Sequence, residues 1–232
     1  MKNKTFATFD EAVADIPDGV TIMFPGFGVV GIPRNLIAAL HRQGAKNLTG
    51  ISNGHGVLEG PVDVGTLIEA GRLKKLICAF TAATHPSRIT PFVRMYNDGE
   101  MDAELVPQGT LAERIRAAGA GIGGFYTPAS VGTELAEGKE HRQINGRTYV
   151  LEHPLPADYA FIRAWKADKL GNLQFRLAGR NFSPIMAMAA KTTIVEVEND
   201  IVEPGELDPD HIHVPCVYVN RMVRIPPDGI WD

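Results

Sequence analysis

A short apolar strand, a glycine-rich turn and an amphipathic helix follow one another between residues 20 and 44. Residues 20–24 form an apolar run of strand length. They lead into Pro-Gly-Phe-Gly-Val-Val-Gly-Ile-Pro, residues 25–33, whose glycines allow sharp backbone turns. Residues 34–43 carry apolar side chains at helical spacing, and Gly44 can end the helix. This order predicts a strand–loop–helix unit of an α/β fold, which directs free N–H groups at an anion such as a phosphate.

The glycines of this turn also match a dinucleotide-binding pattern. Gly26, Gly28 and Gly31 form G-x-G-x-x-G, which in NAD-binding proteins is followed after about 20 residues by an acidic side chain that holds the ribose. No Asp or Glu lies between Asp18 and Glu59. The NAD interpretation therefore lacks half of its support, and the turn either binds another ligand or is a tight turn without one.

The length and composition of the chain indicate its broad class. With 232 residues, 44% of them hydrophobic, the chain can form one α/β domain, and we expect a single domain over residues 1–232. A net charge of −4 gives no electrostatic basis for binding nucleic acid. Two cysteines are too few for a disulfide framework, and Cys78 lies in an apolar run that predicts a buried side chain. No apolar leader or membrane-length run is present, so a soluble, cytoplasmic protein is expected.

Strands and helices are predicted to alternate along the first half of the chain. A capping box, Thr8 with Glu11, predicts a first helix. The expected strands are residues 20–24, 47–52, 73–80 and 103–106, and the expected helices are residues 34–43, 64–70, 86–96 and 110–118. Such alternation is typical of a mainly parallel sheet covered on both faces. Loops 25–33, 52–56 and 107–109 then lie at the carboxyl ends of the strands, where such sheets bind ligands.

The second half of the chain has a different pattern. Residues 119–125 contain four glycines, a composition that can turn bare N–H groups toward a ligand or another backbone. Asn145-Gly146 predicts a type I′ turn in a hairpin over residues 139–152. Further strands are expected at 159–165 and 193–197, a helix at 183–191, and strand-like segments within 214–225.

Several segments match one known family in a fixed order. They include Gly-Phe-Gly-Val-Val-Gly-Ile-Pro at 26–33, Val-Pro-Gln-Gly-Thr-Leu-Ala-Glu-Arg-Ile-Arg at 106–116, and residues 119–128, 166–173, 180–191 and 202–213. On these segments the chain resembles the A (α) subunit of family I CoA-transferases, which include the succinyl-CoA:3-oxoacid and 3-oxoadipate enzymes of ketone-body and aromatic-compound degradation. The resemblance implies a three-layer α/β/α fold with a mainly parallel sheet, of the NagB/RpiA/CoA-transferase type. It also implies a B-subunit partner in a heterotetramer, and CoA as substrate with no separate cofactor.

The resemblance implies covalent catalysis by a glutamate of the B subunit. That carboxylate attacks an acyl-CoA thioester to give a mixed anhydride, and the released CoA thiolate returns to form a glutamyl-CoA thioester while the acid leaves. An incoming acid reverses these steps. The nucleophile lies in a Ser-Glu-Asn-Gly motif, which this chain lacks; Ser52-Asn53-Gly54 comes nearest. No catalytic residue is therefore expected in this chain, which would complete a site that the B subunit's glutamate enters.

The resemblance also assigns binding residues. For CoA they are Pro25, Gly26, Phe27, Gly28, Val29, Val30 and Gly31, and for the carboxylic acid they are Asn53, Gln108 and Phe125. Side-chain amides can donate hydrogen bonds to a carboxylate without adding a full charge. The sequence departs from the family at Pro25, at 54–56, over 57–64 and at 129–130, so the identity of the acid stays open.

Some of these residues also have simpler interpretations. His211 and His213, with aspartates nearby, resemble a metal site, but a histidine loop capped by those aspartates is the favoured interpretation. Glu59 could be a nucleophile or a solvated loop residue, and Gln108 could bind substrate or cap the following helix. The methionines at 186 and 188 are expected in the core or at a subunit contact rather than in a cofactor box, and the family resemblance implies no metal.

Three other functions compete with transfer to a 3-oxo acid. The acceptor could be a short-chain acid such as acetate or butyrate. The chain could be a non-catalytic, CoA-binding regulatory subunit. It could also be a sugar-phosphate isomerase of the same architecture, with loop 25–31 around the phosphate, although that function leaves the later matching segments unexplained.

Overall fold

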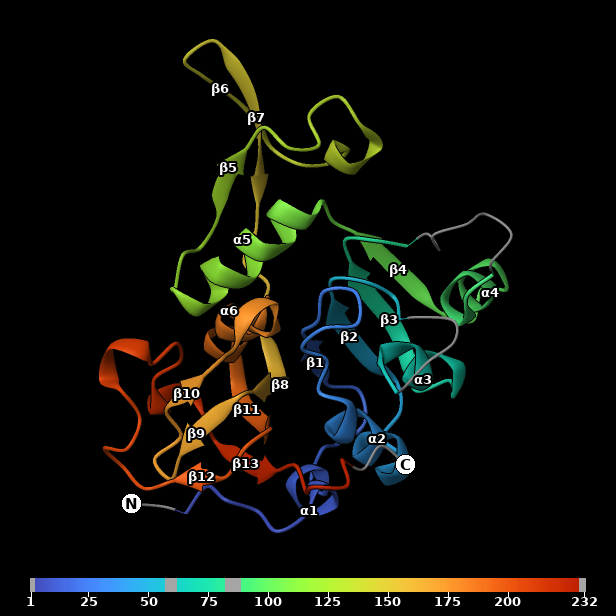
Figure 1. The fold of residues 1–232 in the computed structure, drawn as a ribbon. Helices are drawn as coiled ribbons and strands as arrows, with labels where there is room; N and C mark the ends of the chain where they lie inside the picture. Colours follow the sequence, from blue (N-terminus) through green and yellow to red (C-terminus); the bar gives the residue numbers. More distant parts are fainter. Residues whose placement is uncertain (1–2, 57–61, 82–88, 230–232) are drawn as a thin grey trace.

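The computed structural model describes residues 3–56, 62–81 and 89–229, and a parallel sheet lies at its centre (Figure 1). The order of its seven strands is β13-β11-β8-β1-β2-β3-β4. All of these strand pairs are parallel. The strands are β1 (Thr21–Phe24), β2 (Leu48–Ser52), β3 (Leu73–Cys78), β4 (Asp102–Leu105), β8 (Ala157–Ala164), β11 (Ala190–Val197) and β13 (Arg221–Arg224).

The helices agree with the sequence predictions to within a few residues, except at the start of α4. They are α1 (Phe9–Val13), α2 (Arg34–Gln43), α3 (Val64–Glu69), α4 (Pro91–Asn97), α5 (Gln108–Gly119) and α6 (Ser183–Ala189). The Oγ1 of Thr8 caps α1 by accepting a hydrogen bond from the amide of Glu11, as predicted. Gly44 ends α2 in the left-handed conformation, with φ of +93°. The first residues of the helix predicted over 86–96, residues 86–88, lie outside the described residues. The observed helix α4 begins at Pro91.

Two buried clusters cover the two faces of the sheet. Ile22 and Phe24 of β1 pack with α1 to α4 on one face, whereas Met23 packs with α5 and α6 on the other. Because both faces are covered, successive strand residues are apolar. The three-layer α/β/α fold with a mainly parallel sheet is confirmed.

Strand β1 lies at the point in the sheet where the order of adding strands changes direction. The first half of the chain builds outward from β1 through β2 and β3 to β4, and the second half returns to place β8 on its other side. In open α/β sheets, ligands bind beyond the carboxyl ends of the strands at such a switch point. The loop after β1, residues 25–33, lies at this position.

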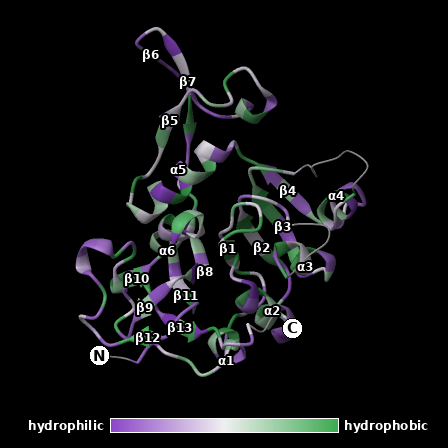
Figure 2. Ribbon diagram, viewed as in Figure 1, coloured by the Kyte–Doolittle hydropathy of each residue, from purple (hydrophilic) through white to green (hydrophobic). Residues whose placement is uncertain are grey.

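Two small sheets complete the described structure. β5 (Phe125–Thr127), β6 (His141–Ile144) and β7 (Arg147–Glu152) form an antiparallel arm that projects away from the body beyond α5 (Figure 1). The arm's outer hairpin turns at Asn145-Gly146, both with positive φ, as predicted, and much of it is hydrophilic (Figure 2). β9 (Lys166–Asp168), β10 (Leu173–Gln174) and β12 (Ile201–Val202) form the other sheet.

The prediction for residues 214–225 was only partly right. Val214 forms an isolated antiparallel bridge with Leu173, a 3₁₀ turn over Cys216–Tyr218 follows, and β13 is the one strand within this segment. Cys78 is buried, as predicted, and burial raises the pKa of its thiol to about 11. Within the described ranges, no helix has the length and apolar character needed to cross a membrane.

Candidate functional site

The glycine loop, residues 25–31, is a tight and exposed turn after β1. Phe27 and Val30 exchange backbone hydrogen bonds of 3.1 and 3.2 Å, which close the turn over Gly28 at φ of +60°. Three apolar side chains stand out from it: Phe27 is 54% exposed, Val29 60% and Val30 43%. The loop therefore presents apolar side chains, rather than charged ones, at the carboxyl edge of the sheet.

The N-terminus of α2, directly behind this loop, is already occupied by a carboxylate of the protein. Oε2 of Glu196, on β11, accepts hydrogen bonds from the amides of Asn35 at 2.9 Å and Leu36 at 3.2 Å. Its Oε1 lies 3.3 Å from Nη1 of Arg163. Glu196 is fully buried, and this burial raises its pKa to about 7.

The remaining amides of the first turn of α2 are also paired. The amide of Arg34 donates to the carbonyl of Ile32, and that of Ile37 donates to the carbonyl of Pro33. The expectation that this strand–loop–helix unit directs free helix N–H groups at a phosphate is therefore wrong for α2. A carboxylate from far along the chain takes the place of the anion.

Two predicted substrate-binding residues meet at the same edge. Asn53 follows β2, and Gln108 is the first residue of α5, which Val106 and Pro107 separate from β4. Nε2 of Gln108 donates to Oδ1 of Asn53 at 2.7 Å. The alternative in which Gln108 caps the helix is not observed, because Pro107 holds the N-cap position and no side-chain hydrogen bond is made there. The two amides thus form one neutral polar unit.

Phe125 lies elsewhere, on the arm. It is half-buried at the start of β5 and pairs with Glu152 of β7. Among the hydrogen bonds and ring contacts of the described residues, none joins Phe125 to Asn53 or Gln108. Glu59 lies outside the described residues. The CoA and acid roles assigned to the loop, to the amide pair and to Phe125 stay predictions.

No role was predicted for His55, which lies two residues after Asn53 within the departure from the family at 54–56. Its ring is buried between Phe80 and Phe92, with ring centroids 5.9 and 5.5 Å away. Both ring nitrogens lack a hydrogen bond in the structure as described. The glycines on either side of His55 had indicated only a polar loop. The stacking depends on residues from β3 onward, so local sequence carried no signal for it.

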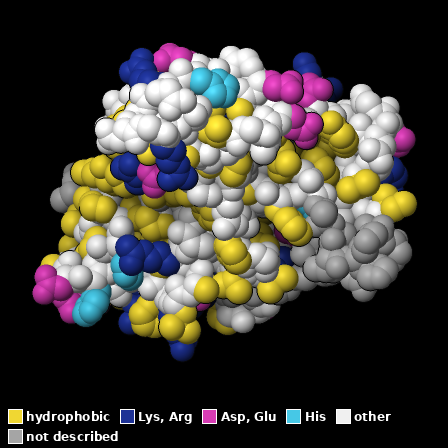
Figure 3. Space-filling model, turned by 90° about the horizontal axis from the view of Figure 1, so that it is seen from above, with side chains coloured by type: hydrophobic (Ala, Val, Ile, Leu, Met, Phe, Trp, Pro, Cys, Tyr) yellow, Lys and Arg dark blue, Asp and Glu magenta, His cyan; other side chains and the backbone are white. Residues whose placement is uncertain are grey.

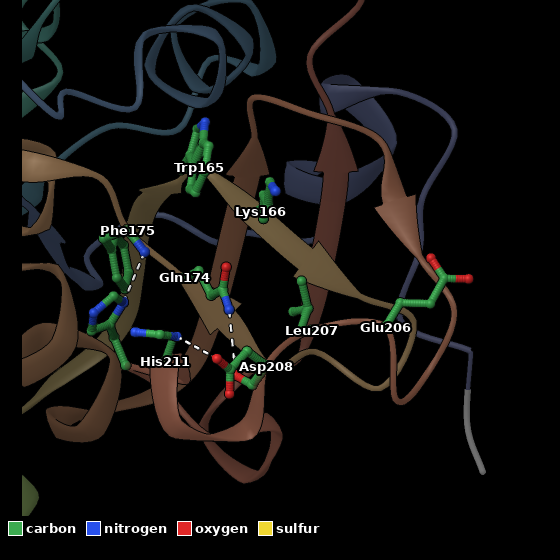
Figure 4. A pocket seen from close by; sticks show the side chains of 9 residues that line it. Trp165, Lys166, Gln174, Phe175, Glu206, Leu207, Asp208 and His211 are labelled. Carbon is green, nitrogen blue, oxygen red and sulfur yellow. Dashed lines mark hydrogen bonds and ion pairs between the residues drawn. The ribbon is translucent and has the colours of Figure 1, made fainter.

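A cavity of about 360 Å³ opens beside β9 and β10 (Figure 4). Two of its residues are the histidines that resembled a metal site. Nδ1 of His211 bonds to Oδ2 of Asp208 at 2.7 Å, while Nδ1 of His213 accepts from the amide of Phe175 at 3.0 Å. To accept from that amide, Nδ1 of His213 must be unprotonated, and burial lowers the pKa of the ring, which favours this state. Within the described chain, no group of three or more His, Cys, Asp or Glu side chains could hold a metal ion. These contacts favour the capped histidine loop.

The surface seen from above mixes charges of both signs with hydrophobic side chains (Figure 3). Acidic and basic groups are interspersed, and no broad patch of one sign faces the viewer. This face therefore lacks the extended positive field that a polyanion would require.

Comparison with known proteins places these features in one family. The family model for coenzyme A transferase matches residues 6–224. The chain is 51% identical over 225 residues to the A subunit of 3-oxoadipate CoA-transferase from Pseudomonas putida, covering 97% of this chain and 95% of the relative. It is also 51% identical over 220 residues to the A subunit of a probable succinyl-CoA:3-ketoacid coenzyme A transferase from Bacillus subtilis, covering 95% of this chain and 89% of the relative.

A solved structure supports the fold. The crystal structure of glutaconate coenzyme A-transferase from Acidaminococcus fermentans superposes with a TM-score of 0.82 at 24% identity, covering 96% of this chain and 76% of that one. The match of the family model, the two curated relatives and the shared fold lead to one conclusion. The chain belongs to the coenzyme A transferase family.

Proposed function

We propose that this chain is the A subunit of a two-subunit CoA-transferase that moves CoA from succinyl-CoA, or another acyl-CoA, to a 3-oxo acid. 3-Oxoadipate and acetoacetate are the leading acceptors. Two relatives at 51% identity carry the names of such subunits, and the alignments span nearly the whole of each chain. CoA is a substrate in this reaction, and no separate cofactor is needed.

The contact between Gln108 and Asn53 is the observation that carries the proposal. Both side chains lie beyond the carboxyl ends of parallel strands, and the hydrogen bond between them fixes the orientation of both amides. With its Oδ1 engaged, Asn53 presents its Nδ2 donors, which can bind a carboxylate oxygen. Because neither group is charged, neither would form an ion pair that lowers the reactivity of a nucleophilic carboxylate brought in by the partner.

In the proposed reaction this chain binds and orients while the partner supplies the nucleophile. The partner's glutamate attacks the thioester carbonyl, CoA thiolate leaves, and the thiolate then attacks the glutamyl carbonyl of the anhydride and displaces the acid. The amide pair would hold the departing and incoming carboxylates in line for attack. The second half-reaction runs the same steps in reverse with the acceptor acid, so the glutamate is regenerated.

The glycine loop suits the middle of the CoA molecule better than its phosphates. Glu196 occupies the N–H groups of α2 that a phosphate would use. The exposed side chains of Phe27, Val29 and Val30 offer apolar contact instead. Such a surface fits the pantetheine arm of CoA or a face of the partner subunit. The same occupancy argues against a sugar-phosphate isomerase that binds its phosphate at this helix.

The proposal is tested by expressing this chain with a B subunit that carries Ser-Glu-Asn-Gly. CoA exchange from succinyl-CoA is then measured with 3-oxoadipate, acetoacetate, acetate and butyrate, and the two separately purified chains serve as controls. Exchange only in the complex, with a 3-oxo acid preferred, is the expected result. A preference for acetate or butyrate would favour a short-chain acid transferase. A well-formed complex that binds CoA and exchanges nothing would refute the transferase and favour a regulatory subunit.

A further inference from the structure

We propose that Asn181 is a positioning residue that holds the glycine loop in the conformation that binds CoA. This inference rests on the proposed function. Asn181 lies far from the loop in sequence, in the turn between the 3₁₀ helix Leu177–Arg180 and α6. Its side chain makes hydrogen bonds both to the loop and to its own turn, so it joins the two segments.

The oxygen of the Asn181 side chain fixes the start of the glycine loop. Oδ1 accepts from the amide of Gly26 at 3.0 Å and from the amide of Phe182 at 2.7 Å. Gly26 directly follows Pro25 at the end of β1 and has φ of +138°. One carbonyl oxygen thus sets the direction in which the chain leaves the strand.

The nitrogen of the same side chain reaches the far side of the loop. Nδ2 donates to the carbonyl of Val30 at 3.4 Å and to the carbonyls of Ala178 and Gly179 at 3.2 and 3.1 Å. Gly31 packs directly on it, since a Cβ there would lie 2.2 Å from Nδ2 of Asn181 and 2.8 Å from the oxygen of Gly179. The absence of a side chain at Gly31 therefore permits this contact.

The backbone of the turn indicates that its geometry is imposed by its surroundings. Asn181 has φ of +21° and ψ of −125°, and Leu177 has φ of +48° with its side chain 86% exposed. Non-glycine residues adopt such conformations at an energetic cost and keep them where neighbouring contacts demand it. Asn occurs at positive φ more often than most other residues do, and unlike Gly it also supplies the hydrogen bonds.

Release of the loop should weaken binding without abolishing the chemistry. The loop would then populate several conformations, and the apparent dissociation constant would rise in inverse proportion to the fraction that is competent to bind. A competent fraction of about one tenth gives about a tenfold weaker affinity for CoA. The acid, which the amide pair is proposed to hold, should bind as before.

The test compares three variants in the complex with the B subunit. Asn181→Gly keeps the backbone conformation accessible and removes all side-chain bonds, and Asn181→Asp keeps the acceptor oxygen for Gly26. Asn172→Ala is the matched control, because Asn172 bonds within its own turn to Asp168 and to the amide of Cys216 without touching the loop. Calorimetry gives the dissociation constant of CoA, steady-state kinetics give KM for acyl-CoA and for the acid, and hydrogen exchange reports on residues 25–31.

For Asn181→Gly we expect faster hydrogen exchange of the backbone amides of residues 25–31. The dissociation constant of CoA and the KM for acyl-CoA should both rise about tenfold, whereas the KM for the acid should stay unchanged. Asn181→Asp should recover part of the protection at Gly26, and Asn172→Ala should leave CoA affinity unchanged. Unchanged CoA affinity in Asn181→Gly, or an equal loss in Asn172→Ala, would overturn the proposal. If the wild-type complex binds no CoA, the proposed function and the role of the glycine loop in binding CoA both fail. Hydrogen exchange over residues 25–31 would still show whether Asn181 holds the loop in place.

Discussion

Replacement of the buried Glu196 by glutamine should change how the stability of the protein depends on pH. Burial raises the pKa of Glu196 from its ordinary value of 4.5 to about 7. Between these two values the folded protein binds more protons at this site than the unfolded chain does. The free energy of unfolding should therefore fall as the pH rises from 5 to 8.

The size of the effect follows from the two pKa values. A carboxyl group with a pKa of 4.5 in the unfolded chain and about 7 in the folded protein removes about 1 kcal/mol of stability at pH 5 and about 3 kcal/mol at pH 8, relative to a group that stays protonated. The difference, about 2 to 3 kcal/mol, is the expected contribution of Glu196 to the change in stability over this pH range. Glu196→Gln stays neutral at every pH and keeps an oxygen to accept from the amides of Asn35 and Leu36.

Urea unfolding of the full chain at several pH values between 5 and 8 provides the measurement. The difference in the free energy of unfolding between wild type and Glu196→Gln should shift by about 2 to 3 kcal/mol in favour of the variant over this range. Glu198→Gln is the matched control. Glu198 binds the same Arg163 at 2.9 Å but is exposed, and its charge adds only a minor part to the raised pKa of Glu196, so its replacement should leave most of the slope in place. Parallel profiles for wild type and Glu196→Gln would refute the reasoning. So would a wild type that gains stability relative to the variant as pH rises, since the hydrogen bonds would then hold the pKa below 4.5.

Three further predictions concern single residues. Gly31→Ala should lower the free energy of unfolding by about 1 to 3 kcal/mol, because the new Cβ would collide with the side chain of Asn181 and because φ at Gly31 is +72°. Chemical denaturation measures this change, and a variant as stable as wild type would contradict the close packing. Iodoacetamide at pH 7.5 should label Cys216 well before the buried Cys78, whose thiol has a pKa raised to about 11. Mass spectrometry of the peptides measures the labelling of each cysteine, and equal rates at both would refute the prediction. Gln108→Glu should raise KM for the acid at least about tenfold by placing a charge beside the carboxylate, while Gln108→Asn should cost less; an unchanged KM in both would remove Gln108 from the acid site.

Local sequence predicted the elements well where local physics decides them. The bounds of α2 follow from apolar spacing and from Gly44, and the Asn145-Gly146 hairpin follows from turn chemistry. The convergence of Asn53 and Gln108 followed from a general rule of parallel sheets, and the structure brings their side chains within 2.7 Å.

Long-range partners were beyond that reasoning. Nothing near α2 in the sequence reveals that Glu196, about 160 residues later, occupies its N-terminus, and the phosphate prediction was wrong for this reason. Asn181 lay within a matching segment, but no pattern linked it to Gly26 or to the glycine loop. A periodicity shows which side of a strand is buried, whereas it does not show which distant side chain satisfies a backbone N–H group.

The position of β1 at the centre of the sheet has a consequence for how the protein is made. A ribosome releases β1 to β4 and their helices long before β8, β11 and the turn at Asn181 exist. The early half can pair its own strands, but one flank of β1 stays open, and the glycine loop and α2 lack the contacts that Asn181 and Glu196 provide. Because those contacts close loops of more than 150 residues, they form late and slowly. During synthesis, the edge of β1 is thus open to pairing with strands of other chains until β8 has been made.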